Sequence, residues 1–303
     1  MQSTTTVGNQ VMTKEKKEDS SRQSLWWDVY KRVKKDKMAM ASITIIAIYF
    51  LIALLCFLGV LGADWAKEVG PSYAPPGSDY LFGTDFLGRD VLAKLIYGVK
   101  VAFSVGLFSA CISIPIGITL GALAGYFGGV VDEIIVWFYS TVSSIPSIML
   151  LMGISLAVGK GLFAVYMALG LTSWVTLSRL IRGEVIKHKD REYVQAATSI
   201  GGGHFRKLFR HILPNVMHIV IIDFSLQFQN AIKAEVILSY LGIGVQGVPS
   251  WGTMIDDAKN VWMSKGVWWE MAGATAFMFV LVLAFNIMGD ALRDALDPKL
   301  RGK

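Results

Sequence analysis

Five polar side chains interrupt an apolar stretch between Val216 and Tyr240, where they could contact a solute within a membrane. They are Asp223, Gln227, Asn230, Lys233 and Glu235. On a helix that turns about 100° per residue, the first three fall within roughly 60° of one another, and Lys233 lies close to that sector. Polar groups at membrane depth face a bundle interior or a water-filled cavity. This face is predicted to line a translocation pathway or to contact another membrane subunit. The alternative is that neighbouring helices satisfy these groups in a purely structural role.

Lys233 and Glu235 are two residues apart, so they point to different sides of a regular helix and cannot pair across it. Each therefore needs another partner, unless the helix breaks at this place.

No arrangement typical of an active site accompanies these groups. The pairs Gly159-Lys160 and Gly302-Lys303 are not followed by Ser or Thr, so the chain has no P-loop. A Gly-x-Ser-x-Gly elbow and a His-Glu-x-x-His helix are also missing. Cys56 and Cys111 both lie inside apolar runs, which favours neither a disulfide framework nor a zinc site. The chain is predicted to be non-catalytic and to hold no metal or cofactor of its own.

Membrane helices are the elements that must position the polar groups. The 303 residues are 53% hydrophobic and 17% charged, with a mean hydropathy of +0.50, whereas soluble domains carry roughly 25% charge. This composition excludes a disordered chain, a coiled coil and a disulfide-knit secreted domain. A crossing helix needs about 20 apolar residues. The sequence therefore predicts an all-α membrane protein with six spans, within Met38–Ala63, Val101–Val131, Ile134–Gly159, Gly161–Ser178, Val216–Tyr240 and Met271–Gly289.

The distribution of Lys and Arg predicts the orientation. Of the 29 basic residues, 21 fall in 1–37, 179–214 and 290–303, and the loops on the opposite side hold seven. Because cytoplasmic loops carry the excess of positive charge, both termini are expected in the cytoplasm. The predicted organisation is a tail over 1–37 whose last part, about 24–37, is an amphipathic interfacial helix. A six-helix body follows over 38–290, and then a short tail over 291–303. A cleavable signal peptide is not expected.

Small residues and prolines within the spans predict how the helices pack. Gly117, Gly121, Gly125 and Gly129 repeat every four residues, a spacing that lets another backbone approach closely. Proline removes a helical hydrogen bond, so Pro115 and Pro146 are expected to kink their spans.

The segment Arg179–Pro214 is predicted to form two helices joined by a turn at the cytoplasmic surface. Gly183–Ser199 has a helical pattern, three glycines follow at 201–203, and His204–Leu213 forms a second short helix that Pro214 stops. Small alanines before the turn would let this helix end enter a groove on another protein. DNA binding is disfavoured, because both flanks run directly into membrane spans.

The first outer loop, from about Gly62 to Val99, contains a second candidate surface. Asp residues in it can cap helix starts, and the glycines supply turn geometry. One interpretation is a structured turn that leads into the next helix. The other is a docking surface for an extracytoplasmic partner, whose candidate residues are Gly83, Thr84, Asp85, Gly88, Arg89 and Asp90.

The cytoplasmic segment resembles the "EAA" loop of ABC importer permeases. The matching residues are Gln195, Ala196, Ala197, Gly201, Leu213 and Pro214, at the spacing of that loop. Gln195 replaces the family's Glu, and His211 stands at its Ile position. Four other segments resemble the C-type subunit of the dipeptide/oligopeptide permeases: Phe82–Asp90, Leu238–Gln246, Ser250–Gly252 and Gly289–Pro298. Glu235 also sits where that family has an acidic residue.

This resemblance implies a type I ABC importer permease subunit in the bacterial cytoplasmic membrane. It implies a homologous second permease subunit, two cytoplasmic ATPase subunits that bind ATP and Mg, and an extracytoplasmic binding protein that delivers peptide. The six residues that match the EAA loop would then couple this chain to the ATPases.

Two other classes of protein compete with this interpretation. A secondary transporter coupled to an ion through Asp223, Lys233 and Glu235 should show inverted internal repeats, and none is evident. A membrane-embedded enzyme should show an acid/base pair or a metal site. Among importers of the resembled type, nickel chelates and glutathione are alternative solutes to peptides.

Overall fold

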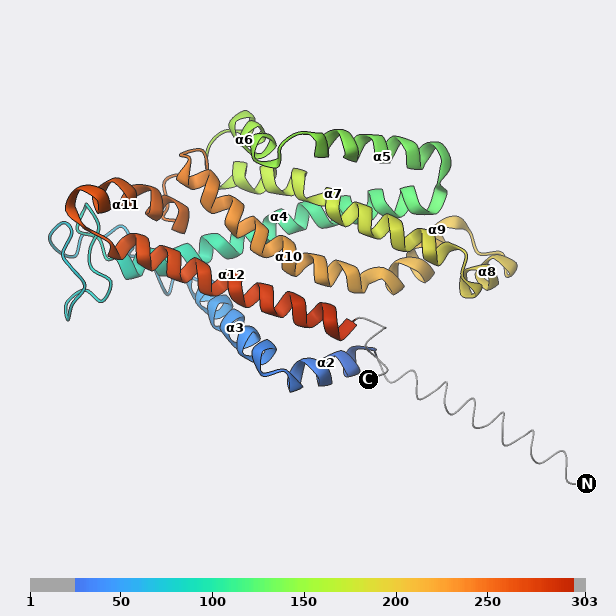
Figure 1. Ribbon diagram of the computed structural model, residues 1–303, viewed down its shortest axis with the longest axis horizontal. Coiled ribbons are helices and arrows are strands. Elements are labelled where there is room, and N and C mark those ends of the chain that lie inside the picture. The colour runs from blue at the N-terminus through green and yellow to red at the C-terminus, as the bar shows by residue number, and fades with distance from the viewer. Residues whose placement is uncertain (1–24, 297–303) are drawn as a thin grey trace, which may run out of the picture.

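The computed structural model describes residues 25–296, with side chains from Tyr30 onward. The tail sequence at 1–24 and the last seven residues of the chain lie outside the described residues. Within residues 25–296 every regular element is a helix, and two isolated β-bridges occur in the first long loop. In chain order (Figure 1) the elements are α2 (Leu25–Lys35), α3 (Lys37–Phe57), α4 (Val91–Phe127), α5 (Gly129–Ser144), α6 (Ser147–Val158), α7 (Leu162–Lys189), α8 (Glu192–Ser199), α9 (His204–Arg206), the π-helix η1 (Lys207–Ile212), α10 (Leu213–Tyr240), α11 (Trp251–Lys265) and α12 (Trp269–Leu296).

Five helical segments are long and apolar enough to cross a membrane. They are α3, α4, α7, the continuous stretch His204–Tyr240, and α12. The helices α5 and α6 pass the same test only as a pair, and they meet at 91°. Five of the six predicted spans are therefore single helical segments. The third, over Ile134–Gly159, is a broken one, so the count is five or six.

Pro146 accounts for the position of this break. It has no N–H to continue the helix, and it disfavours helical geometry in the residue before it. Ile145 accordingly has φ −85° and ψ 130°. Pro115 behaves differently, because α4 continues past it without interruption.

The closest helix pair is α4 with α7, which run side by side through the middle of the molecule (Figure 1). Three of the four predicted glycines face α7: Gly117, Gly121 and Gly125. A Cβ atom on Gly121 would lie 2.4 Å from the carbonyl oxygen of Ser178, and one on Gly125 would lie 2.7 Å from that of Arg182. The glycines therefore allow backbone contact. Gly129 does not join them, since it begins α5 with φ +50° and open space around it.

Aromatic residues fill the core between α4, α10 and α12. The rings of Phe228 and Phe285 stack with centroids 4.2 Å apart, and Phe103 meets Phe228 edge-on at 5.3 Å. All three side chains are buried. The offset and edge-on arrangements add to the dispersion energy of the contact.

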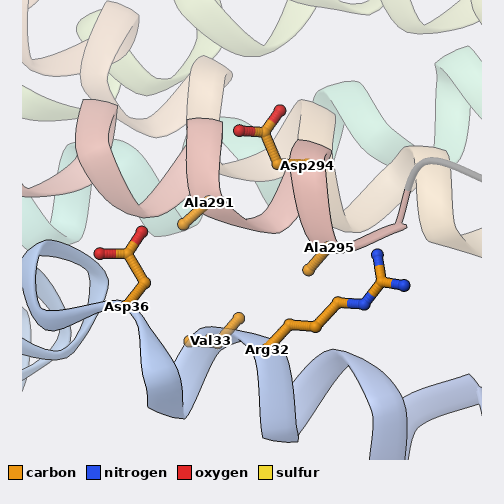
Figure 2. Close-up of a pocket in the computed structure, with 6 residues that line it drawn as sticks. All are labelled: Arg32, Val33, Asp36, Ala291, Asp294 and Ala295. Atoms are coloured by element: carbon orange, nitrogen blue, oxygen red, sulfur yellow. The ribbon is translucent and has the colours of Figure 1, made fainter. Parts of the chain in front are cut away.

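The amphipathic helix α2 lies along the last turns of α12. Asp36 separates α2 from α3 and caps α3, since its Oδ1 accepts hydrogen bonds from the backbone N–H groups of Met38 and Ala39. Figure 2 shows the cleft of about 230 Å³ between the two helices, with Arg32 and Val33 of α2 facing Ala291 and Ala295 of α12. This contact ties the first helix to the C-terminal end of the bundle.

Candidate functional site

The predicted cytoplasmic turn is built from α8, the loop 200–203 and α9, at one end of the molecule (Figure 1). The single helix expected over Gly183–Ser199 is two helices. α7 runs to Lys189, and α8 starts after Arg191, which has extended backbone angles of φ −73° and ψ 150°. The break re-aims α8 away from the axis of α7, so the turn projects from the end of the bundle.

The end of α8 has the geometry of a Schellman motif. The N–H of Gly201 donates to the carbonyl of Thr198 at 3.0 Å, and that of Gly202 donates to the carbonyl of Ala197 at 2.8 Å. Gly201 adopts φ +81°, which glycine reaches without the steric cost that a Cβ atom would add. The sequence Gly201-Gly202 therefore fixes where α8 ends and how the chain turns back.

Pro214 does not stop the second helix, contrary to expectation. Helical backbone runs without a gap through α9, η1 and α10, and Pro214 occupies the first turn of α10. The π-helical turns Lys207–Ile212 lie directly before it. A wider turn accommodates the proline ring and the lost N–H, so the helix continues into the membrane span. The turn is thereby joined rigidly to α10.

The six predicted coupling residues divide between the surface and the interior. Gln195, Ala196, Gly201 and Pro214 are exposed, whereas Ala197 and Leu213 are buried. The buried pair belongs to the interior side of the turn, where Val194 and Leu208 form part of a cluster with α7 and α10. The exposed members are the ones that another protein could contact.

An apolar patch on this turn was not predicted. Ile200, Phe205 and Phe209, called the tip patch below, are 87%, 71% and 55% exposed. The two phenylalanine rings lie parallel, with centroids 6.1 Å apart. Large exposed apolar side chains that gather on a surface mark a site of contact with another protein or with a membrane. The phenylalanines four residues apart in a basic segment, a helical spacing, were the signal that could have revealed it.

The five polar residues of α10 separate into three environments. Asp223 is buried and accepts a hydrogen bond from Gln227 Nε2, while Gln227 Oε1 accepts one from Ser113 Oγ at 2.6 Å. These bonds join α10 to α4. They give Asp223 and Gln227 hydrogen-bonding partners within the protein, as the structural alternative for this face would require.

Glu235 holds the loop that follows α10. Its carboxylate accepts a hydrogen bond from Ser239 Oγ at 2.7 Å, and Ser239 Oγ accepts one from the N–H of Val245 at 3.0 Å. Glu235 is 1% exposed. It therefore faces away from the surface that Asn230 and Lys233, both exposed, share.

Asn230 and Lys233 line a cavity of about 180 Å³ between α10 and α6, together with Ser147 and Ile148. Of the predicted pathway residues, these two are the ones that face open space. No ion pair of Lys233 occurs within the described residues.

The outer-loop candidates mostly stabilise the loop itself. Thr84 and Asp85 are fully buried. Asp85 accepts hydrogen bonds from the backbone N–H groups of Leu87 and Arg89, at 2.8 and 2.9 Å. It also pairs at 3.0 Å with the buried Lys94, which makes a second ion pair with Glu270.

Gly83 and Gly88 of this loop both have φ +70°, and Asp90 caps α4. Arg89 and Asp90 remain half-exposed, so these two keep side chains available to a partner. Arg89 lies 5.5 Å from the Trp65 ring and lines a cavity of about 380 Å³ with Asp257. Desolvation raises the pKa of Asp257; Lys94 opposes this shift, and Asp256 and Asp85 add to it.

Among the side chains that the structure describes, from Tyr30 to Leu296, no three His, Cys, Asp or Glu residues gather in a way that could hold a metal ion.

Comparison with protein families gives two matches. Residues 117–302 match the binding-protein-dependent transport system inner membrane component, and residues 24–76 match the N-terminal TM domain of oligopeptide transport permease C. Together the two matches cover most of the chain.

Curated relatives align over nearly their whole length. The chain is 36% identical to the dipeptide transport system permease protein DppC of Bacillus subtilis, over 90% of this chain and 86% of that protein. It is 34% identical to the oligopeptide transport system permease protein OppC of the same organism, over 92% and 91%. The glutathione transport system permease protein GsiD of Pectobacterium atrosepticum is 32% identical, over 93% and 94%.

Among solved structures, the chain resembles one from inward-facing conformations of the MetNI methionine ABC transporter. The TM-score is 0.52 at 17% identity, and the match covers 67% of this chain and 96% of that one. This likeness concerns the fold.

Proposed function

Because the chain belongs to the family of binding-protein-dependent transport system inner membrane components, and has a type I ABC importer permease fold, we propose that it is the C-type permease subunit of an ATP-driven peptide importer. One observation carries this proposal: 90–92% of the chain aligns with dipeptide and oligopeptide permeases at 34–36% identity. The exposed turn at Gln195–Gly201 agrees with it, since an importer subunit without its own P-loop needs a surface on which a motor can act.

The proposed arrangement in the membrane has six crossings, with the broken pair α5–α6 as the third. Both termini and the turn at 192–203 lie in the cytoplasm of a bacterium, since 21 of the 29 basic residues fall on that side. The body spans 38–290, with tails over 1–37 and 291–303. The outer loop and α11 face the opposite side.

The proposed complex contains a homologous second permease subunit, two ATPase subunits and an extracytoplasmic binding protein. The ATPases bind ATP and Mg and dock on Gln195, Ala196, Gly201 and the tip patch. The binding protein meets the outer end, where Arg89 and Asp90 are accessible. This chain contributes no catalytic residue.

The geometry supports a mechanism of alternating access. Since η1 and α10 form one continuous helical stretch, a displacement of the turn moves α10 as well. Tyr126 at the end of α4 meets His204 at 3.0 Å, and the glycine contacts hold α4 against α7. Closure of the ATPases on ATP would therefore move α4, α7 and α10 together, which reorients the pathway between them and the second permease.

Reconstitution tests the proposal. The complex, co-purified with its neighbouring subunits and placed in proteoliposomes, should take up a labelled peptide only when ATP and the binding protein are both present. A cysteine at Thr198, an exposed position of α8, should crosslink to an ATPase subunit during turnover. Uptake by this chain alone would favour the ion-coupled transporter, and a Thr198→Cys variant that never crosslinks would refute the docking site.

Glutathione is the second candidate solute, because a glutathione permease is 32% identical over 94% of its length. Competition distinguishes the two. An excess of unlabelled glutathione should leave the uptake of a labelled tripeptide unchanged if peptides are the solute.

A further inference from the structure

The break between α5 and α6 exposes an unusual stretch of chain. Seven consecutive residues, from Ser143 to Met149, are exposed, in the middle of what is otherwise an apolar span. Irregular backbone at membrane depth is tolerated where it lines a water-filled cavity or is covered by protein. The break therefore marks a place where polar groups meet either a water-filled cavity or another protein.

A cavity of about 400 Å³ lies beside the break, between it and α7. Hydroxyl groups and one cation supply its polar lining: Ser143, Ser144, Ser147, Thr172, Thr176 and Arg179. The guanidinium of Arg179 donates from Nη2 to Ser143 Oγ at 2.9 Å and lies 4.8 Å from the Tyr139 ring. Both partners are neutral, so its charge is not balanced by them.

Ser147 also lines the smaller cavity that contains Asn230 and Lys233. Both cavities therefore reach the start of α6. None of their lining residues is Asp or Glu. The ion pairs within residues 25–296 include neither Lys233 nor Arg179, whereas Arg182, one turn further along α7, pairs with Asp132.

The two cations lie at different depths. The N–H of Gly161 donates to the carbonyl of Gly244 at 3.1 Å, which places the start of α7 level with the end of α10. At 1.5 Å per residue, Lys233 lies about 10 Å below Tyr240, and Arg179 lies about 25 Å below Leu162. An anionic group moving inward would meet Lys233 first and Arg179 about 15 Å later.

We propose that Lys233 and Arg179 are successive binding points for the C-terminal carboxylate of the transported peptide, with the hydroxyl groups around the α5–α6 break completing the polar lining. This inference rests on the proposed function. An unpaired cation at membrane depth, such as Lys233, is costly, so it marks a solute pathway or a protein contact. Arg179 lies nearer the cytoplasmic end of α7, where such a pathway would open. The carboxylate is the anionic group that every unmodified peptide carries, and a lining of cations and hydroxyls without carboxylates complements it.

The test compares one peptide in two forms, with a free C-terminal carboxylate and with a C-terminal amide. Uptake is measured in proteoliposomes that contain the whole complex, with the binding protein saturated by each peptide. Lys233→Gln should lower uptake of the free acid about tenfold more than uptake of the amide, since an ion-pair contact is lost only with the acid. Arg179→Gln should act in the same direction. Every variant uses the same binding protein. The preference of that protein for the acid or the amide therefore cancels when each uptake rate is divided by the wild-type rate for the same peptide.

Lys160→Gln is the matched control. Lys160 is exposed in the turn between α6 and α7 and lines neither cavity. Its replacement removes the same charge and should leave both uptake rates unchanged. Equal loss of both peptides in Lys233→Gln would overturn the inference in favour of a contact with the second permease. Failure of wild type to import either peptide would instead overturn the proposed function.

A charge-rescue measurement keeps the test decisive if the amide is not imported at all. Lys233→Cys is made together with Cys111→Ser, which removes the exposed native cysteine and leaves the buried Cys56. An aminoethyl methanethiosulfonate reagent, which restores an ammonium group at position 233, should recover uptake of the free acid. A neutral methyl reagent of the same chemistry should not. Equal recovery with both reagents, or recovery with neither, would contradict a role for the positive charge.

Discussion

Lys94 shows how single residues hold the outer loop on the bundle. It is 4% exposed and makes ion pairs with Asp85 of the loop and Glu270 at the start of α12. A buried cation between two carboxylates leaves one negative charge in excess. Two backbone N–H groups donate hydrogen bonds to the Asp85 carboxylate and stabilise its charge. These bonds explain why Asp85 is buried inside the loop, whereas its residue type suggested a place on an exposed docking surface.

Removal of Lys94 should therefore cost more than removal of either partner. Lys94→Met leaves two buried carboxylates uncompensated and is expected to destabilise the subunit by about 3–5 kcal/mol. Glu270→Gln keeps the pair between Lys94 and Asp85, and its expected cost is clearly smaller. Thermal unfolding of the detergent-purified complex measures both. A Glu270→Gln variant that melts at or below the temperature of Lys94→Met would contradict this charge balance.

The close contact between α4 and α7 depends on glycines of α4, which have no side chain to hold the two backbones apart. A Cβ atom on Gly121 would meet the backbone of α7 at 2.4 Å, while Gly183, on α7, has nothing within 4 Å of its Cβ position. Neither φ lies in the left-handed region. The same substitution should therefore have opposite effects at these two positions.

Gly183→Ala is expected to stabilise the subunit by up to about 1 kcal/mol, because alanine has the higher helix propensity. Gly121→Ala should destabilise it, since α7 must move away from α4 and lose dispersion contacts. The melting temperatures of the two variants report the difference. If both shift in the same direction, the close approach of α4 and α7 is not what Gly121 provides.

At the end of α8 the prediction concerns backbone conformation. Gly201→Ala forces a Cβ atom into φ +81°, at a cost of about 1–2 kcal/mol. Gly203 has φ −66° and open space, so Gly203→Ala is the control. Peptide-stimulated ATP hydrolysis by the complex should fall in Gly201→Ala and stay near wild type in Gly203→Ala. Equal activities of the two variants would show that the shape of the turn is not needed for coupling.

Much of the helix arrangement can be predicted from the sequence. A charge-free run predicts a membrane span by its length, and the glycine repeat predicts a close helix contact by the small size of its residues. The misplaced boundaries have local causes. Ile145 and Pro146 turn one span into two helices, and the π-turns before Pro214 let a helix continue where a proline indicated a stop. The α10 residues could not be sorted from sequence, since the partners of Asp223 and Glu235 depend on which helices and loops pack beside them.

On the scale of the whole molecule, the two ends of the bundle differ in what they expose. One end carries the exposed tip patch, and the opposite end carries a loop whose polar residues mostly bond within the loop itself. Between them, α10 connects the turn directly to the cavity at Lys233. A force applied at Phe205 or Phe209 of the tip patch can therefore reach the cavity at Lys233 through one continuous helical stretch.

Polar replacement of the tip patch should separate docking from folding. Phe205→Ser with Phe209→Ser removes two exposed rings, so the subunit should keep its melting temperature while the purified complex loses its ATPase subunits. Met263→Ser, which alters an 82% exposed side chain of α11 near the other end, controls for the loss of exposed apolar surface. Because exposed apolar anchors contribute most of the binding energy in such interfaces, ATPase retention should fall at least tenfold in the double variant and remain unchanged in the control. Full retention by the double variant would place the coupling contact elsewhere on the turn, at Gln195 or Ala196, whose exposed side chains are polar or small.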